Sequence, residues 1–487
     1  MKRDDARNRK DYPATRLHQE SNIIMNILLQ LFHMTPKRYL QYRTVLRVCL
    51  PLVLSLSATT LMEFTDRIFL ANYEIDAISA ALPAASVSFL LLVFFGGVSG
   101  YAGVFIAQYT GRGDHHKVGS VLWQALWFSL GAAVVIFILG LFAEPIFAFV
   151  GHTARVQQLE CTYFSILCNG SVLQLVMVTL SAFLTGRGLT RPVMVITFIG
   201  VAINIPLDYA LIFGHLGFPE YGIGGAAVAT VFSWMVNTLL LASLIFTRHN
   251  NREFAVFDGW RFHRERFFRL MRFGIPGAMQ FTTDVATFTF FILLVGRIGG
   301  NALAATNIVF SINSLSFMPA MGASQGVSIL VGQALGRGKP KQAKDAVRRA
   351  SEMLFFYVLL VDMAMLFYPE ILLSPFFVEN GPEGQAVQEM AVVLLRIVAA
   401  FLFFDAFYMV FSGALRGAGD TAYMMWAAGL TGIFTMVLPV WVGIVFFDIS
   451  ITTAWFAVLA FLATIFTLSL RRYLTGKWQK MIVIEEE

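Results

Sequence analysis

The segments Gln108-Tyr-Thr-Gly-Arg-Gly113 and Gln333-Ala-Leu-Gly-Arg-Gly338 repeat one pattern at an offset of 225 residues (333 − 108). Arg47-Val-Cys-Leu-Pro51 and Arg272-Phe-Gly-Ile-Pro276 repeat another pattern at the same offset (276 − 51). A third match, Ser-x-x-Leu-x-Gly-x-Gly-x-Thr, pairs 181–190 with 412–421 at an offset of 231 (412 − 181). Three matches in the same order indicate an internal duplication, with a short insertion in the second copy.

Apolar runs surround these segments along most of the chain. Of the 487 residues, 57% are hydrophobic and 14% are charged, whereas soluble domains carry roughly 25% charged residues. Runs of about 20 apolar residues, long enough to cross a ~30 Å hydrocarbon core, recur about twelve times. We therefore predict an all-α polytopic membrane protein with two homologous six-helix lobes. The expected spans are 45–72, 77–109, 118–149, 159–185, 192–214, 222–247, 268–298, 302–335, 350–377, 387–415, 422–447 and 450–470.

Basic residues are concentrated in the loops after even-numbered spans and near both termini, whereas the other loops are mainly acidic. The richest basic stretch, Arg248 to Arg272, separates the two halves, and Arg416 belongs to the loop after the tenth span. By the positive-inside rule, this bias predicts that both termini and the even loops are cytoplasmic. The net charge of +6 follows from this topology, so we expect no nucleic-acid partner.

These features divide the chain into five parts. Residues 1–44 form a cytoplasmic arm, in which Ile23 to Met34 is expected to be an interfacial helix. The N-lobe spans 45–248, a cytoplasmic linker 249–267, the C-lobe 268–471, and a short solvated cytoplasmic tail 472–487. Because each lobe has six spans, both have the same orientation, and the repeat axis runs along the membrane normal.

The motifs of membrane enzymes and ATP-driven pumps are missing from the sequence. All eight histidines lie outside the apolar spans, and neither an H-E-x-x-H nor a Cys/His zinc pattern occurs. There is no G-x-x-x-x-G-K-[ST] phosphate loop, and the three cysteines fall within apolar spans, where a thiol is usually buried. We therefore favour a secondary transporter over an enzyme, and expect no cofactor and no metal centre.

Acidic residues inside apolar spans are costly, so each one that is retained marks a candidate site. Asp66 and Asp208 each precede an outer loop by about six residues, which places both ~9 Å inside the membrane. Thr230 enters from the same side, and Asn204 lies one turn before Asp208 on the same face. Oxygen ligands of this kind suit a hard cation, whereas a proton needs only a buried carboxylate, so the set leaves Na+ and H+ open.

Two further acids lie deeper. Asp284 and Asp405 are each roughly 17 Å from the cytoplasmic boundary, near the midplane, where they can meet. Glu63 and Arg67 stand one turn apart in the first span and are expected to pair with each other.

The order of these motifs resembles that of the multidrug and toxic compound extrusion (MATE) family, most closely its bacterial NorM-type branch. The resemblance runs from Val45 to Leu470. It rests on Phe64-Thr-Asp66, Gln108-x-x-Gly111, Asn204-x-x-x-Asp208, Gly224-Gly-Ala-Ala-Val-Ala-Thr230, Phe273-Gly-Ile-Pro276, Asp284, Asp405 and Gly413-Ala-Leu-Arg-Gly417.

The resemblance implies a V-shaped pair of lobes that exports organic cations from a bacterial cell in exchange for Na+ or H+. It implies a protein of the inner membrane, working as a monomer among membrane lipids. Cation binding is implied for Asp284 and Asp405 in the C-lobe and, in the N-lobe, for the set Asp66, Asn204, Asp208 and Thr230. A tyrosine that often precedes the helix-ten Asp by four residues in this family is Phe401 here.

Aromatic residues near the two C-lobe acids are candidates for a drug pocket, although about half are expected to face lipid or to serve in packing. This set comprises Phe281, Phe288, Phe403, Phe404, Phe407, Tyr408 and Met279. A flippase for a lipid-linked or polar substrate is the main alternative within transport. Such a protein should carry more arginine in its lumen-facing helices, whereas the spans here hold acids.

Overall fold

The computed structural model describes residues 35–149, 152–376 and 382–485, and its regular elements are all helical within these ranges. Twelve helical segments of this described part are long and apolar enough to cross a membrane, which confirms the number expected from the sequence. The long helices are Pro36–Tyr73 (α2), Ile75–Gly100 and Ala102–Arg112 (α3 and α4), His115–Leu141 (α5), Ala154–Gly186 (α7), Thr190–Phe213 (α8), Ile223–Ile245 (α9), Arg264–Val295 (α11), Gly300–Gly336 (α12), Pro340–Phe367 (α13), Pro382–Ala418 (α15), Thr421–Thr431, Gly432–Val437 and Leu438–Phe447 (α16, η3 and α17) and Ile451–Leu474 (α18). Shorter elements are Ala143–Ala148 (α6), Arg248–Phe254 (α10), Asp258–Trp260 (η1), Pro369–Leu373 (α14), Ser374–Phe376 (η2) and Lys477–Lys480 (η4).

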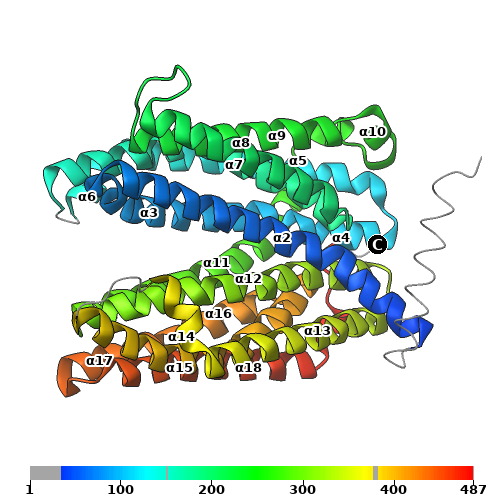
Figure 1. The fold of residues 1–487 in the computed structure, drawn as a ribbon. Helices are drawn as coiled ribbons and strands as arrows, with labels where there is room; N and C mark the ends of the chain where they lie inside the picture. The colour runs from blue at the N-terminus through cyan, green and yellow to red at the C-terminus, as the bar shows by residue number, and fades with distance from the viewer. Residues whose placement is uncertain (1–34, 150–151, 377–381, 486–487) are drawn as a thin grey trace, which may run out of the picture.

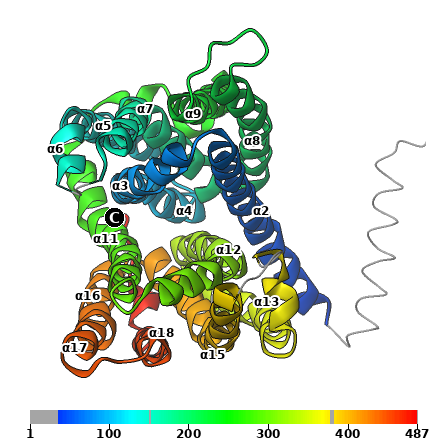
Figure 2. The ribbon, with the colours of Figure 1, turned by 60° about the vertical axis from the view of Figure 1, so that its left-hand side comes forward.

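The helices form two lobes that together make a V. Figure 1 shows α2 to α9 in one lobe and α11 to α18 in the other, converging at the end that carries α10 and the C-terminus and diverging toward the end that carries α6 and α17. In Figure 2, α4 of the N-lobe faces α12 of the C-lobe between the two bundles. The V shape implied by the resemblance is therefore present. We call the narrow end, where the lobes touch, the closed end.

The first long helix starts earlier than the sequence predicted and reaches across to the other lobe. Thr35 caps α2, its hydroxyl accepting from Arg38 N at 3.4 Å. Near this start, Gln41 donates to Asp345 Oδ2 of α13 at 2.8 Å and accepts from Arg349 Nε at 3.0 Å. Part of the expected cytoplasmic arm is thus a helical bridge between lobes. The expected interfacial helix from Ile23 to Met34 lies outside the described residues.

The duplicated segments meet each other at the closed end. Gln108 Nε2 of α4 donates to Gly417 O at 3.1 Å, and Gln333 Nε2 of α12, its counterpart in the repeat, donates to Gly186 O at 2.9 Å. Gly186 and Gly417 are themselves counterparts in the third repeated pattern. Each lobe therefore makes the same contact with the other, related by the internal symmetry.

The backbones approach so closely at this contact that only glycine fits. A Cβ at Gly111 would stand 2.2 Å from Gln333 O, and a Cβ at Gly336 would stand 2.1 Å from Gln108 O. Real carbon–oxygen contacts of this length do not occur, so both glycines are required by the packing. We call Gln108, Gly111, Gln333 and Gly336 the lobe latch.

The expectation of a solvated C-terminal tail is wrong for the residues that the structure describes. Trp478, Val483 and Ile484 are completely buried. Val483 N donates to Gln108 Oε1 at 2.9 Å, and Arg269 of α11 donates to the carbonyls of Val483 and Ile484 at 2.5 and 2.8 Å. The short apolar run 481–484 covers the lobe junction, because its side chains gain more by burial there than in solvent.

Candidate functional site

The N-lobe brings together three of its four expected residues. Asp66 of α2 and Asp208 of α8 face each other, and Asn204 lies beside Asp208. Asp66 is 7% exposed, and Asp208 and Asn204 are fully buried. Within the described residues, the oxygens of Asp208 and the polar side-chain atoms of Asn204 make no hydrogen bond of normal length and angle, although Asp66 and Asn204 both lie next to Asp208. Two buried carboxyl groups with unpaired oxygens can share a proton or bind a small cation.

The remaining neighbours of this pair differ from the sequence-based expectation. Thr230 is buried in α9, but its hydroxyl donates to Ala226 O at 3.0 Å on its own helix rather than to an acid. Tyr163 of α7, which the sequence analysis did not select, is buried close to both acids. Glu63 and Arg67 form no salt bridge within 4.0 Å in the described structure, although Arg67 lies close enough to act electrostatically on Glu63.

In the C-lobe, Asp284 of α11 lies close enough to Asp405 of α15 to act on it electrostatically, a proximity that their matched depth made possible. They are 7% and 6% exposed. Tyr408 donates its hydroxyl to Asp284 Oδ2 at 2.8 Å and accepts from Gln280 Nε2 at 3.0 Å, and Gln280 also donates to Ser412 Oγ at 2.7 Å. Asp284 therefore belongs to a hydrogen-bonded network that ties α11 to α15, and Asp405 lies near it.

The missing family tyrosine has a structural explanation here. Phe401 is buried and stacks on Trp455 of α18, with ring centroids 6.1 Å apart. A hydroxyl near the acids comes instead from Tyr408, which follows Asp405 by about one turn rather than preceding it. The spacing of Gln280 and Asp284 on α11, and of Tyr408 and Ser412 on α15, places each pair on one helix face, but it does not show that these two faces meet.

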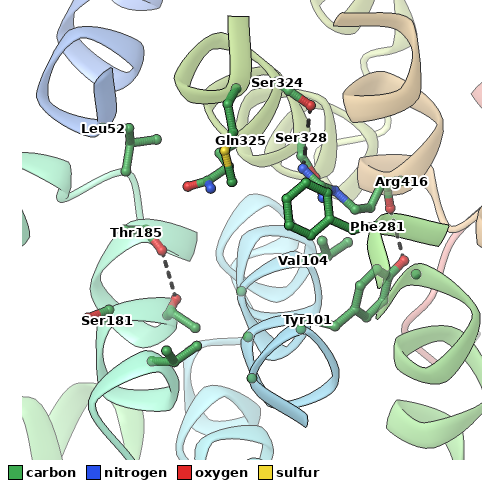
Figure 3. Close-up of a pocket in the computed structure, with 18 of the residues that line it drawn as sticks. Leu52, Tyr101, Val104, Ser181, Thr185, Phe281, Ser324, Gln325, Ser328 and Arg416 are labelled. Carbon is green, nitrogen blue, oxygen red and sulfur yellow. Dashed lines mark hydrogen bonds between the residues drawn. The ribbon is translucent and has the colours of Figure 1, made fainter. Parts of the chain in front are cut away.

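A cavity of about 410 Å³ lies between the lobes, just inside the closed end. Figure 3 shows it from within, with Arg416 and Phe281 on the C-lobe side and Ser181 and Thr185 on the N-lobe side. Its walls come from α2, α3, α4, α7, α8, α11, α12 and α15 and are rich in small residues. These include Gly96, Gly97, Gly100, Gly103, Ala182, Gly277, Ala278, Ser324 and Ser328.

None of the six expected site residues lines this cavity, and Phe281 alone of the seven candidate aromatic and methionine residues does so. Phe403 and Phe404 instead pack against Phe466 of α18. Arg416, assigned from the sequence to a cytoplasmic loop, is in the last turn of α15 and lines the cavity. A cavity built from small residues of eight helices has no local sequence signal, because each helix contributes only a few positions.

A second cavity of about 100 Å³ inside the N-lobe shares Ser181 and Val193 with the large one. Met62 and Val201, which lie about one turn before Asp66 and Asn204, also line it. Polar side chains of α9 also line it. The small cavity therefore extends from the large cavity toward the N-lobe acids.

The family model described as MatE matches residues 51–210 and again residues 276–441. The chain belongs to the MatE family. The two matches begin at Pro51 and Pro276, the residues that end one of the repeated patterns, so each lobe carries one MatE unit. The resemblance noted from the sequence is thereby confirmed.

Relatives of similar length support the MatE assignment. A protein of Thermotoga maritima described as "Probable multidrug resistance protein NorM" is 30% identical over 455 residues, covering 91% of this chain and 95% of that protein. A Brucella suis protein with the same description is 28% identical over 431 residues, covering 87% and 91%.

Solved structures share the MatE fold. A MATE family transporter in an outward-facing conformation superposes with a TM-score of 0.81 at 20% identity, covering 92% of this chain and 97% of that one. A MOP superfamily transporter from Pyrococcus furiosus superposes with a TM-score of 0.80 at 21% identity, covering 90% and 95%.

Proposed function

We propose that this MatE protein is a secondary active multidrug efflux transporter, which exchanges organic compounds, organic cations among them, for Na+ or H+. One observation carries the proposal. Each lobe contains a pair of buried acids, and neither pair lines the largely apolar cavity between the lobes. The description of its relatives as multidrug resistance proteins supports the same function. The chain then acts as a carrier rather than an enzyme, with the coupling ion in place of a cofactor.

Coupling follows from the cost of charge in a membrane. An acid pair inside the bundle is stable only when a proton or cation neutralises it. We propose that an ion passes between the large cavity and the acids through the small N-lobe cavity, which is lined by residues one turn from Asp66 and Asn204. In the C-lobe, the network around Asp284 connects α11 and α15, which also supply Phe281 and Met409 to the cavity wall.

Binding of a proton or a cation to either acid pair can therefore change the packing of the helices that line the cavity. If the ion and the organic compound favour different arrangements of the lobes, each weakens the binding of the other, because binding free energies are reciprocally linked. This indirect linkage gives antiport. It does not require the two ligands to compete for the same carboxylate.

We further propose an orientation in a bacterial inner membrane with both termini and the closed end in the cytoplasm, so that the described state opens outward. One chain supplies both acid pairs and the cavity, so a monomer surrounded by lipid is sufficient. Green fluorescent protein, which folds in the cytoplasm but not after export, should fluoresce when fused at the C-terminus or inserted near Asn251. A dark but stably produced fusion at either position contradicts this orientation.

Ethidium efflux from energised cells tests the transport proposal. The Asp208→Asn variant should insert normally and lose gradient-driven efflux, because it removes a charge that the coupling ion must neutralise. Asp258→Asn makes the same chemical change in the exposed linker and should export at the wild-type rate. Efflux by Asp208→Asn equal to that of Asp258→Asn would exclude Asp208 from coupling.

A further inference from the structure

The linker between the lobes is docked on α5. The indole of Trp123 donates to Val256 O at 2.6 Å, and the indole of Trp127 donates to Trp260 O at 3.0 Å. The helix α10, which precedes this stretch, also packs against α5 at the closed end (Figure 1). We call residues 255–263, which follow α10 and lead into α11, the docked linker.

The contact with α5 is made by the backbone of the docked linker. Gln124 of α5 donates to Arg261 O at 3.0 Å and accepts from His263 N at 3.0 Å. A Cβ at Gly119 of α5 would stand 2.3 Å from Ala255 O, so the linker backbone lies directly on the helix. These backbone contacts fix the docked linker in place and leave several of its side chains exposed.

The exposed side chains of the docked linker and of the start of α11 include four aromatic rings. Phe257, Trp260, Phe262 and Phe268 are between 45% and 57% exposed. Apolar side chains gathered on one part of a surface mark an interaction site, because contact with water is unfavourable for them. We call these four residues the aromatic patch.

The aromatic patch continues the lipid-facing stripe of α5. Trp127, Leu130, Val134 and Ile138 are exposed and recur at helical spacing along one face. The 27 residues of α5 extend over about 40 Å, roughly 10 Å more than the hydrocarbon core, so the helix reaches into the headgroup layer. The stripe begins at Trp127, whose indole holds Trp260 O. The patch therefore lies where tryptophan is enriched in membrane proteins, at the boundary between acyl chains and headgroups.

Positive charge accompanies the aromatic patch. Arg261 and Arg264 are exposed, and no carboxylate of the described residues lies within 4.0 Å of either guanidinium. Cζ of Arg264 lies 5.6 Å from the ring centre of Phe268. The stretch 248–272 carries seven arginines and three acids, a net charge of +4 (7 − 3). Aromatic rings flanked by arginines fit an anionic lipid surface, which attracts basic segments beside membrane-spanning helices.

We propose that the docked linker anchors the lobe junction to the membrane by binding anionic phospholipid. Trp260 and Phe262 lie at the base of the headgroups, and Arg261 and Arg264 bind the lipid phosphates. A second copy of the chain fits the patch less well, because two such surfaces facing each other bring like charges together. The inference goes beyond the transport proposal and does not depend on which compound or ion is carried.

Fluorescence quenching by brominated lipid tests the contact directly. The three native cysteines are replaced, and His263→Cys, an exposed position between the two arginines, carries a bimane fluorophore. The purified full-length protein is reconstituted in vesicles of phosphatidylcholine with a minor fraction of phosphatidylglycerol. Bromine is placed on the acyl chains of all the phosphatidylglycerol or of an equal amount of the phosphatidylcholine. Brominated phosphatidylglycerol should quench at least about twofold more strongly than the same amount of brominated phosphatidylcholine.

Substitutions separate the roles of charge and rings. Arg261→Gln combined with Arg264→Gln should remove the preference for the anionic lipid, and retained quenching by brominated phosphatidylcholine shows that the linker still lies at the membrane. Trp260→Ser should weaken quenching by both lipids. As the matched control, Arg297→Gln combined with Arg471→Gln removes the same charge from exposed positions outside the linker and should leave the preference unchanged.

Three results would overturn the proposal. The first is absence of quenching by either lipid, which places the linker in water or against a second copy of the chain. The second is equal quenching by the two lipids in the protein with both arginines. The third is an undiminished preference after both arginines are replaced. None of these measurements involves transport, so failure of the transport proposal is a separate outcome.

Discussion

The lobe latch predicts that one methyl group at the closed end will shift the balance between conformations. In Gly111→Ala, the new Cβ would stand 2.2 Å from Gln333 O, so the lobes must separate locally by at least 0.8 Å (3.0 − 2.2) to reach the shortest tolerable contact. The Gln333 oxygen belongs to the backbone, so it cannot move aside by rotation of a side chain. Overpacking of this kind costs about 1–3 kcal/mol, which lowers the population of the closed latch roughly 5- to 150-fold.

Thiol labelling measures this change. In a background without the three native cysteines, Ser181→Cys places a thiol in the cavity wall. A membrane-impermeant methanethiosulfonate reagent added on the side of the closed end should label this thiol at least about fivefold faster in Gly111→Ala than in the parent protein. Gly336→Ala should behave alike, since its Cβ would stand 2.1 Å from Gln108 O.

The control is another glycine of the same lobe. A Cβ at Gly131 of α5 meets nothing within 4 Å, so Gly131→Ala should label at the parent rate. Equal labelling rates in Gly111→Ala and Gly131→Ala, with both proteins folded, would refute the idea that the latch holds the lobes closed.

Two further predictions concern hydrogen bonds within the described structure. Tyr408→Phe removes the donor to Asp284 and leaves a buried acceptor unpaired, so it should destabilise the protein by about 1–3 kcal/mol; an unchanged melting temperature and unchanged ion dependence of dye binding would contradict this. Arg269→Gln removes two bonds to the C-terminal segment and should speed tryptic cleavage at Lys480, whereas Arg264→Gln, on the exposed start of the same helix, should not. Equal cleavage rates in the two arginine variants would show that the segment is held by other contacts.

The features that could be predicted from the sequence are those with local or periodic signals. Span length, the internal repeat and the depth of each buried acid follow from counting residues along one helix. Such counting placed Asp284 and Asp405 at one depth, where they could meet, because helices that cross the same membrane share a scale of depth. The repeat also located the latch, although the sequence alone did not show that the two copies touch.

The features that escaped prediction depend on contacts between distant segments. Arg416 was assigned to a loop because it follows a long apolar run, and its place in the cavity depends on how α15 packs against α12. The apolar run 481–484 was overlooked in a polar tail, since nothing local shows that the lobe junction is uncovered. Tyr408 was counted as one aromatic among several, and its bond to Asp284 became visible only in the folded bundle.

The most direct test of the proposed mechanism is ion-driven transport by the purified protein in liposomes. With ethidium as the substrate, an imposed Na+ or H+ gradient should drive its movement against a concentration difference, and collapse of the gradient should stop it. Asp66→Asn and Asp405→Asn should each abolish the gradient-driven component. Ethidium movement that is indifferent to both gradients, or that persists at the wild-type rate in both variants, would contradict coupling through the buried acids.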